Sequence, residues 1–169
     1  GDRVALLGRS GAGKSSLLAV INGSLRPQTG QVRFRGVPLP SLTRRQRAEI
    51  GTLWQDLRLI DELSIGQNVN AGALARHRLG WALANLLFRI GTDASRHCLR
   101  QAGLEEALLG DQALDRPVRQ LSGGQRQRVA LARLFRQQPA LMLADEPLAS
   151  LDPAIAAEVL ERLLACDLD

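Results

Sequence analysis

Gly8-Arg9-Ser10-Gly11-Ala12-Gly13-Lys14-Ser15 is the stretch that decides the fold of this chain. It follows the pattern G-x-x-x-x-G-K-[ST], in which glycines let backbone N–H groups converge on phosphate oxygens. The apolar run Val4–Leu7 precedes it and predicts a short buried strand. Leu17, Leu18 and Ile21 follow at a spacing that predicts a helix with one apolar face. Strand, glycine turn and helix N-terminus together predict a phosphate-binding loop.

Two side chains of this loop carry its predicted chemistry. Lys14 is placed to reach the β- and γ-phosphates of a nucleotide, and Ser15 to offer its hydroxyl to Mg²⁺. Lys14 is the only lysine of the chain, and all the other residues counted as Lys or Arg are arginine. The loop needs a slim, mobile point charge, which a planar guanidinium does not supply.

Composition excludes several classes of protein. A chain of 169 residues with 45% hydrophobic and 23% charged residues forms about one soluble domain with a sizeable core. The net charge is +5, but aromatic residues are 3% and arginines are spread along the chain, so nucleic-acid binding is not expected. Cys98 and Cys166 lack metal-ligand spacing and predict reduced thiols in the cytoplasm. The longest apolar stretch, 79–87, is too short to span a bilayer.

The chain up to Gln55 alternates between strand and helix signals. Residues 31–35 predict a surface strand that Gly36 and Pro38 end. A short polar helix then opens at 41–45, with Ser41 or Thr43 as its N-cap. Residues 50–54 predict a further strand, which ends at Gln55.

Helical spacing dominates from Asp56 to Arg119. It predicts one helix carrying Ile65 and Val69, a second over 79–88, and a third over 94–102 that Gly103 stops. This segment is interpreted as a helical insert on an α/β core. We interpret its arginines, including Arg76, Arg78 and Arg89, as a solvated face. His77 and His97 are expected to have surface or packing roles.

Two further motifs follow the insert. Leu121-Ser122-Gly123-Gly124-Gln125 opens a helix with glycines at its N-terminus, which predicts a second anion site. The apolar run 140–144 predicts a buried parallel strand, with Asp145 and Glu146 at its C-terminal end, where open α/β sheets bind ligands. Asp145 is placed to hold Mg²⁺ and Glu146 to orient or deprotonate an attacking water. Asp152 predicts the N-cap of a last helix, with Pro153 at its first position.

These motifs resemble, in order and spacing, those of ATP-binding cassette (ABC) ATPases. Gly8–Ser15 is similar to the Walker A loop, Gln55 to the Q-loop, and Leu121–Gln125 to the signature. Leu141–Glu146 is similar to the Walker B strand and Ser150-Leu151-Asp152 to the D-loop. The resemblance implies an α/β P-loop NTPase of RecA-like core with a mainly parallel sheet. The core would comprise 1–55 and 120–169, and 56–119 would be a helical subdomain inserted between the Q-loop and the signature.

The resemblance also implies a mechanism. Two such domains, forming a homodimer, would face each other head to tail and hold each ATP between the loop of one and the signature of the other. Ser122 and Gly124 would contact the γ-phosphate in trans, and Asp152 would cross the interface. Catalytic roles would fall to Glu146, Gln55 and Lys14, and Mg²⁺ would be held by Ser15, Gln55 and Asp145. Nucleotide contacts would come from Gly8, Arg9, Ser10, Gly11, Ala12, Gly13, Lys14, Ser15, Ser16, Leu121, Ser122, Gly123, Gly124, Gln125 and Asp152.

Two family features are missing, namely an adenine-stacking aromatic residue before Gly8 and a switch histidine after the D-loop. We therefore expect a fragment truncated at both ends, which binds nucleotide weakly and hydrolyses it poorly. Residues 61–69 and the Trp81-containing stretch resemble ATPase subunits of phosphonate importers. The implied partners are transmembrane permease subunits and, indirectly, a solute-binding protein, at the cytoplasmic face of the inner membrane. The alternatives are an ABC importer or exporter ATPase for another solute, or a soluble ABC ATPase not tied to transport, such as one that acts in translation. The long coiled coil that a DNA-repair type would place between the Walker motifs is absent.

Overall fold

The computed structural model describes residues 2–146 and 153–165 of the chain. The elements, with η for short 3-10 helices, are α1 (Lys14–Ile21), β1 (Arg33–Phe34), β2 (Val37–Pro38), η1 (Leu39–Ser41), α2 (Arg44–Ala48), β3 (Ile50–Leu53), α3 (Ile65–Ala71), η2 (Leu74–Arg76), α4 (Leu79–Leu87), α5 (Thr92–Gln101), η3 (Glu106–Leu108), α6 (Asp111–Leu114), η4 (Val118–Gln120), α7 (Gly123–Gln137), β4 (Leu141–Ala144) and α8 (Pro153–Ala165). None of these helices is long and apolar enough to cross a membrane.

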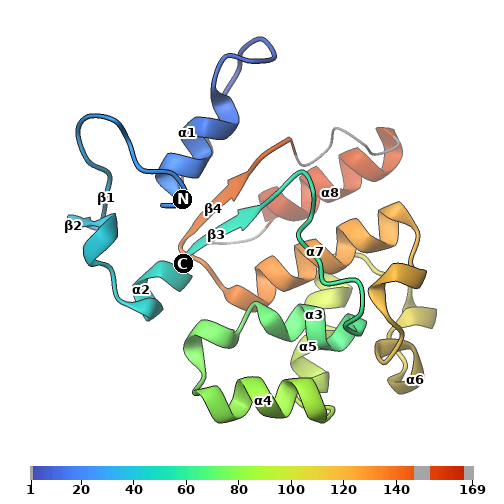
Figure 1. Cartoon of the computed structure of the whole chain (residues 1–169). Coiled ribbons are helices and arrows are strands. Elements are labelled where there is room, and N and C mark those ends of the chain that lie inside the picture. The colour runs from blue at the N-terminus through green and yellow to red at the C-terminus, as the bar shows by residue number, and fades with distance from the viewer. Residues whose placement is uncertain (1, 147–152, 166–169) are drawn as a thin grey trace.

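The strands β3 and β4 lie side by side at the centre of the molecule (Figure 1). They pair in parallel, in a register that runs from Ile50 opposite Leu141 to Leu53 opposite Ala144. A parallel pair needs a long crossover between its strands, and α3 to α7 supply it. Both predicted strands are confirmed, and their C-terminal ends point to the same edge.

A small antiparallel hairpin of β1 and β2 lies apart from this pair (Figure 1). The prediction for 31–35 was too long, because only Arg33–Phe34 pairs. Arg35 and Gly36 have φ of 50° and 78°, which is the geometry of a two-residue hairpin turn. Gly36 therefore turns the chain into a second strand, in which Pro38 takes part, instead of ending the structure.

Helix α7 is the centre of the larger hydrophobic core. Val129, Leu131 and Ala132 are fully buried, and they pack with Leu53 of β3 and Ile65 of α3. A capping box starts α7: the Ser122 side chain accepts from the Gln125 backbone N–H, and the Gln125 side chain accepts from the Ser122 N–H. The helix ends at Gln138, whose left-handed φ of 49° is followed by Pro139.

Two glycines make close approaches around α7. A Cβ on Gly51 of β3 would lie 2.5 Å from Leu134 Cδ1. A Cβ on Gly72, at the end of α3, would lie 2.1 Å from the backbone oxygen of Arg133. The contact at Gly72 is with backbone, which cannot move aside, so this approach to α7 needs a residue without a side chain. At Gly51 the Leu134 methyl can rotate, and the Pro139 ring, 2.8 Å from the added Cβ, is the stiffer neighbour.

The predicted strand at Val4–Leu7 is wrong. These residues form neither strand nor helix, and Val4 and Leu7 are 84% and 93% exposed. Apolar side chains favour a strand only where a neighbouring ladder and a covering layer bury them, and within the described part of the chain neither lies along this segment. The apolar face of α1 is also narrower than predicted, because Leu18 is buried but Leu17 is 46% exposed.

The helices predicted between β3 and α7 are confirmed, as α3, α4 and α5. Ser64 caps α3 with a capping box to Gln67, and Gly103, with φ of 76°, follows the end of α5. Thr43 is the cap of α2, which settles the choice between Ser41 and Thr43. The division of the chain into a core and a subdomain stays a prediction, since one hydrophobic cluster includes residues of both parts.

Candidate active site

The loop before α1 has the curled backbone that its glycines predicted. Gly11 and Gly13 have φ of 79° and 87°, and Ala12 N–H donates to the Arg9 oxygen at 3.1 Å. A Cβ at either glycine would meet nothing within 4 Å, so open space surrounds the loop. Gly13 is the N-cap of α1 and no side chain caps the helix. The first N–H groups of α1 are therefore left to a partner from outside.

The Lys14 ammonium lies within this curl. Its Nζ donates to the Gly8 and Arg9 backbone oxygens at 3.0 and 3.1 Å. These carbonyls hold a mobile cation at the point where the loop is open. A phosphate oxygen arriving there would meet a charge-assisted donor together with the N-terminal N–H groups of α1.

Ser15 and Asp145, 130 residues apart in sequence, meet in space. The Ser15 hydroxyl donates to Asp145 Oδ1 at 2.9 Å. Asp145 is 8% exposed, and its backbone N–H donates to the Leu53 oxygen at 3.0 Å, which holds it at the end of β3. A hydroxyl and a carboxylate side by side are hard oxygen ligands, which suit Mg²⁺. The residues present therefore fit the predicted metal.

Gln55 and Glu146 are brought to the same edge of the sheet. They lie two residues beyond Leu53 and Ala144, which face each other in the parallel register. Both are exposed, and Glu146 has a left-handed φ of 45°. A positive φ at a non-glycine residue is strained and is typical of functional positions. The predicted catalytic carboxylate and amide thus lie next to Asp145.

The predicted signature is at the N-terminus of α7, as expected. Leu121 is buried, Ser122 and Gly123 are exposed, and Gly124 and Gln125 are half-buried. Within the described residues no hydrogen bond joins Leu121–Gln125 to Gly8–Ser15, and Figure 1 shows the loop and this end of α7 well apart. Contact of the signature with a nucleotide in trans stays a prediction. Asp152 lies outside the described residues.

A sequence model of the ABC transporter family matches residues 1–149. The chain belongs to this family. The stretches predicted as the two Walker motifs, the Q-loop glutamine and the signature all lie within the matched residues.

Curated relatives of this ABC chain include phosphonate import ATP-binding proteins named PhnC. The protein of Anaeromyxobacter dehalogenans is 48% identical over 163 residues, which are 94% of this chain and 32% of that protein. The protein of Wolinella succinogenes is 39% identical over 97% of this chain and 59% of its own length. The chain therefore spans between about a third and three fifths of the length of these relatives.

Solved ABC structures share the fold. The dimeric bacterial ABC transporter cassette MJ0796 superposes with a TM-score of 0.72 at 29% identity, over 92% of this chain and 65% of that one. The same cassette in a post-hydrolysis state, bound to ADP and Pi, gives the same TM-score and identity. These neighbours confirm the P-loop fold predicted from the sequence.

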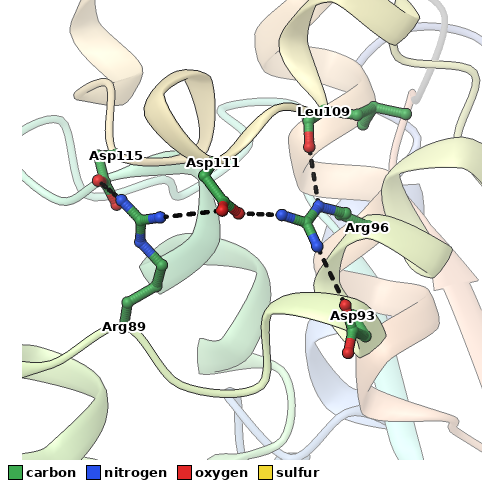
Figure 2. A network of polar contacts seen from close by, with 6 residues as sticks. All are labelled: Arg89, Asp93, Arg96, Leu109, Asp111 and Asp115. Carbon is green, nitrogen blue, oxygen red and sulfur yellow. Dashed lines mark hydrogen bonds and ion pairs between the residues drawn. The ribbon is translucent and has the colours of Figure 1, made fainter.

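Some arginines of the segment interpreted as a solvated face form ion pairs. Figure 2 shows Arg89 and Arg96 on either side of Asp111. Arg89 also pairs with Asp115, and Arg96 Nε donates to the Leu109 oxygen at 2.9 Å. This network joins α5, α6 and the segment before α5. His77 stacks on Trp81 with ring centroids 4.1 Å apart, and His97 is exposed, so both histidine predictions are confirmed.

An ion-pair cluster holds α8, which follows the predicted D-loop, against α7. Glu158 accepts from Arg128 of α7 at 2.8 Å and from Arg162 at 2.9 Å. The hydrogen bond from Arg128, followed by that from Arg162, lowers the pKa of Glu158. Arg162 also donates to the Gln101 oxygen at 3.0 Å, at the end of α5.

Sequence reasoning missed Arg133 of α7. Its guanidinium donates to the backbone oxygens of Leu57 and Arg58, in the turn that follows Gln55. Burial lowers the pKa of Arg133. The available signal was an arginine placed directly after Leu131 and Ala132, in a helix that is otherwise apolar there. Arginine in such a position is expected to have a specific partner.

Proposed function

We propose that this chain is the nucleotide-binding part of an ABC importer ATPase, which couples ATP-driven dimer closure to uptake of a phosphonate or a related phosphorus oxyanion. The contact between Ser15 and Asp145 carries the proposal, because it joins the loop that suits phosphate to the strand end that suits Mg²⁺. Similarity to the PhnC proteins supports the choice of solute.

The proposed roles follow from the placement of each group. The loop N–H groups and Lys14 bind the phosphates, and Ser15, Asp145 and Gln55 would hold Mg²⁺. Mg²⁺ held there would supply positive charge that neutralises the phosphates. Glu146 accepts a proton from, or orients, the attacking water, since a carboxylate at this edge lies next to the phosphate site.

The proposed partners are a second copy of the domain and a membrane permease. A second copy would bring Ser122 and Gly124 to the γ-phosphate. The dimeric state of the MJ0796 cassette supports this arrangement. Permease subunits would place the protein at the cytoplasmic face of the inner membrane, and a solute-binding protein would choose the solute.

Two variants of the full-length protein test the ATPase. Glu146→Gln removes the proposed base and is expected to lower kcat by at least about a hundredfold, with ATP binding retained. Lys14→Met removes the phosphate-binding cation and is expected to weaken ATP binding itself. Arg78→Gln is the matched control, because it removes a charge from an exposed residue before α4, outside both the phosphate loop and the signature. Wild-type rates in Glu146→Gln would refute the proposed role.

Co-purification tests the transport part. We would tag the full-length protein in its native cells, solubilise gently and identify bound chains by mass spectrometry. A multi-span permease without its own cassette, together with a solute-binding protein, is the expected result. Isothermal titration of that binding protein with a phosphonate would then test the solute. Ribosomes, or no membrane partner, would refute transport and leave only the ATPase.

A further inference from the structure

We propose that Arg133 is a positioning residue for Gln55, and that it makes the position of Gln55 depend on helix α7. The inference rests on the proposed ATPase function, in which Gln55 acts at Mg²⁺ or the attacking water. Arg133 Nη2 donates to the Leu57 oxygen at 2.5 Å, and Nη1 donates to the Arg58 oxygen at 2.6 Å. One guanidinium therefore holds two successive carbonyls, two and three residues beyond Gln55.

The segment that Arg133 holds does not favour its own conformation. Leu57 and Arg58 both have left-handed φ, of 57° and 46°. Left-handed backbone is unfavourable for side chains with a Cβ, and two such residues in succession are less favourable still. A conformation of this kind persists only where surrounding contacts impose it. The two hydrogen bonds from Arg133 are contacts of that kind.

The rest of the turn ties this conformation to Gln55. Leu57 N–H donates to the Trp54 oxygen at 3.0 Å, which closes a turn around Gln55. The Arg58 guanidinium lies 3.7 Å from the centroid of the Trp54 ring. Trp54 and Arg58 thus flank Gln55 on both sides, and release of the two carbonyls would loosen the whole turn.

The other end of the connection is the predicted signature. Arg133 lies about three helical turns along α7 from Ser122. The helix is continuous over this length and is packed from Gln127 onward, with Val129, Leu131 and Ala132 fully buried. A displacement of the signature end therefore moves Arg133 as well, and with it the carbonyls after Gln55. Binding of a nucleotide at the signature would therefore change the position of Gln55 in the same domain.

Arg133→Lys in the full-length protein tests the proposal. Lysine keeps the charge but replaces the forked guanidinium with a single ammonium, which cannot hold both carbonyls in the same geometry. Amide exchange in a peptide covering 54–60 is expected to be about tenfold faster, the factor expected for loss of one hydrogen bond to a charged group. We expect kcat for ATP to fall by about tenfold or more, with KM within about twofold, because Gln55 acts on the transition state.

Arg136→Lys is the matched control. Arg136 is on the same helix and similarly half-buried, but its side chain donates to Asn70 Oδ1 on α3. Exchange at 54–60 and kcat should both stay at wild-type values. Arg133→Gln is a second variant, expected to exceed Arg133→Lys in both effects because it also loses the charge.

Unchanged exchange at 54–60 in Arg133→Lys would overturn the proposal, and so would faster exchange with unchanged kcat. Equal effects in Arg136→Lys would also overturn it, because they would indicate a general loosening of α7. A wild-type protein without ATPase activity would refute the proposed function instead. Even then, the exchange comparison would decide whether Arg133 holds the turn.

Discussion

Two helix N-termini with glycines beside them, at α1 and α7, are held in different ways. Gly13 caps α1 in a left-handed conformation without a side-chain hydrogen bond, and the loop before it is exposed. Ser122 caps α7, and its hydroxyl and the Gln125 amide satisfy two backbone N–H groups of that end. The first terminus therefore has no side-chain partner for its N–H groups, whereas at the second the Ser122 and Gln125 N–H groups are already bonded by its own side chains.

The two helices also differ in how deeply they are buried. Helix α7 has fully buried residues on several faces, whereas Leu18 is the one buried residue of α1 among those described. Glycines at a helix N-terminus therefore serve two purposes in this protein. At α1 it leaves donors free for a ligand, and at α7 it begins the most deeply packed element of the chain.

The largest expected effect on stability comes from Gly72→Ala, which places a side chain against the backbone of α7. The added Cβ would lie 2.1 Å from the Arg133 oxygen and 3.0 Å from the Gln137 nitrogen, both backbone atoms of α7 that cannot move independently. We expect a loss of about 3 kcal/mol or more of unfolding free energy, measured by urea denaturation. Gly80→Ala is the control: nothing lies within 4 Å of its added Cβ, and alanine inside a helix should stabilise by up to about 1 kcal/mol. Similar values for both would contradict the close packing.

Gly13→Ala attacks the open terminus and separates stability from binding. Its φ of 87° is strained for alanine, so we expect a loss of about 1–2 kcal/mol in unfolding free energy. Nucleotide affinity should fall about tenfold beyond that, because the loop N–H groups would no longer converge. Calorimetric titration with ATP, next to a melt of the same sample, measures both. An unchanged affinity would show that the curl of the loop is not needed for binding.

Local signals explain which parts of this comparison the sequence predicts. The capping box at Ser122 and the glycine turn before Lys14 depend on residues a few positions apart, so each can be recognised in isolation. The strand β4 is predicted for a similar reason, because an apolar run ends abruptly at Asp145.

Features that depend on distant partners were missed. The strand predicted at Val4–Leu7 needed a neighbouring ladder that the described residues do not provide, and hydrophobicity could not reveal this. The contact of Arg133 depends on a left-handed turn at Leu57 and Arg58, where neither residue type signals that conformation. The contact between Ser15 and Asp145 is an exception: 130 residues separate them, but the loop pattern and the strand end each assigned one of these side chains to Mg²⁺.

Ser122→Ala has a smaller expected effect and sharpens the contrast at α7. Loss of the cap should cost about 1 kcal/mol of unfolding free energy, because the Gln125 N–H loses its acceptor. Ser122→Asn keeps a good capping acceptor and should recover most of this loss. If Ser122 also contacts a nucleotide, ATPase activity will stay low in Ser122→Asn although stability returns. Recovery of both would assign the hydroxyl a capping role only.

His77 gives the smallest expected effect, at the other end of α7. Its ring stacks on Trp81, and burial, followed by the charges of Arg136 and Arg76, lowers its pKa below the usual 6.5. The unfolded chain then binds the proton at a higher pH than the folded protein. Stability from the neutral ring is therefore complete above 6.5 and is lost as the pH falls toward the lowered value.

His77→Phe preserves stacking without titration and isolates this contribution. The melting temperature should fall less in His77→Phe than in the wild type between about pH 7.5 and 5.5, since carboxylates titrate alike in both. Arg76 also donates to the Arg136 oxygen, so the histidine lies where η2 is held to α7. Identical pH dependence in the two proteins would mean that the imidazole does not experience these arginines. A smaller fall in His77→Phe would show that burial, together with Arg136 in the last turn of α7 and Arg76, disfavours a charged imidazole.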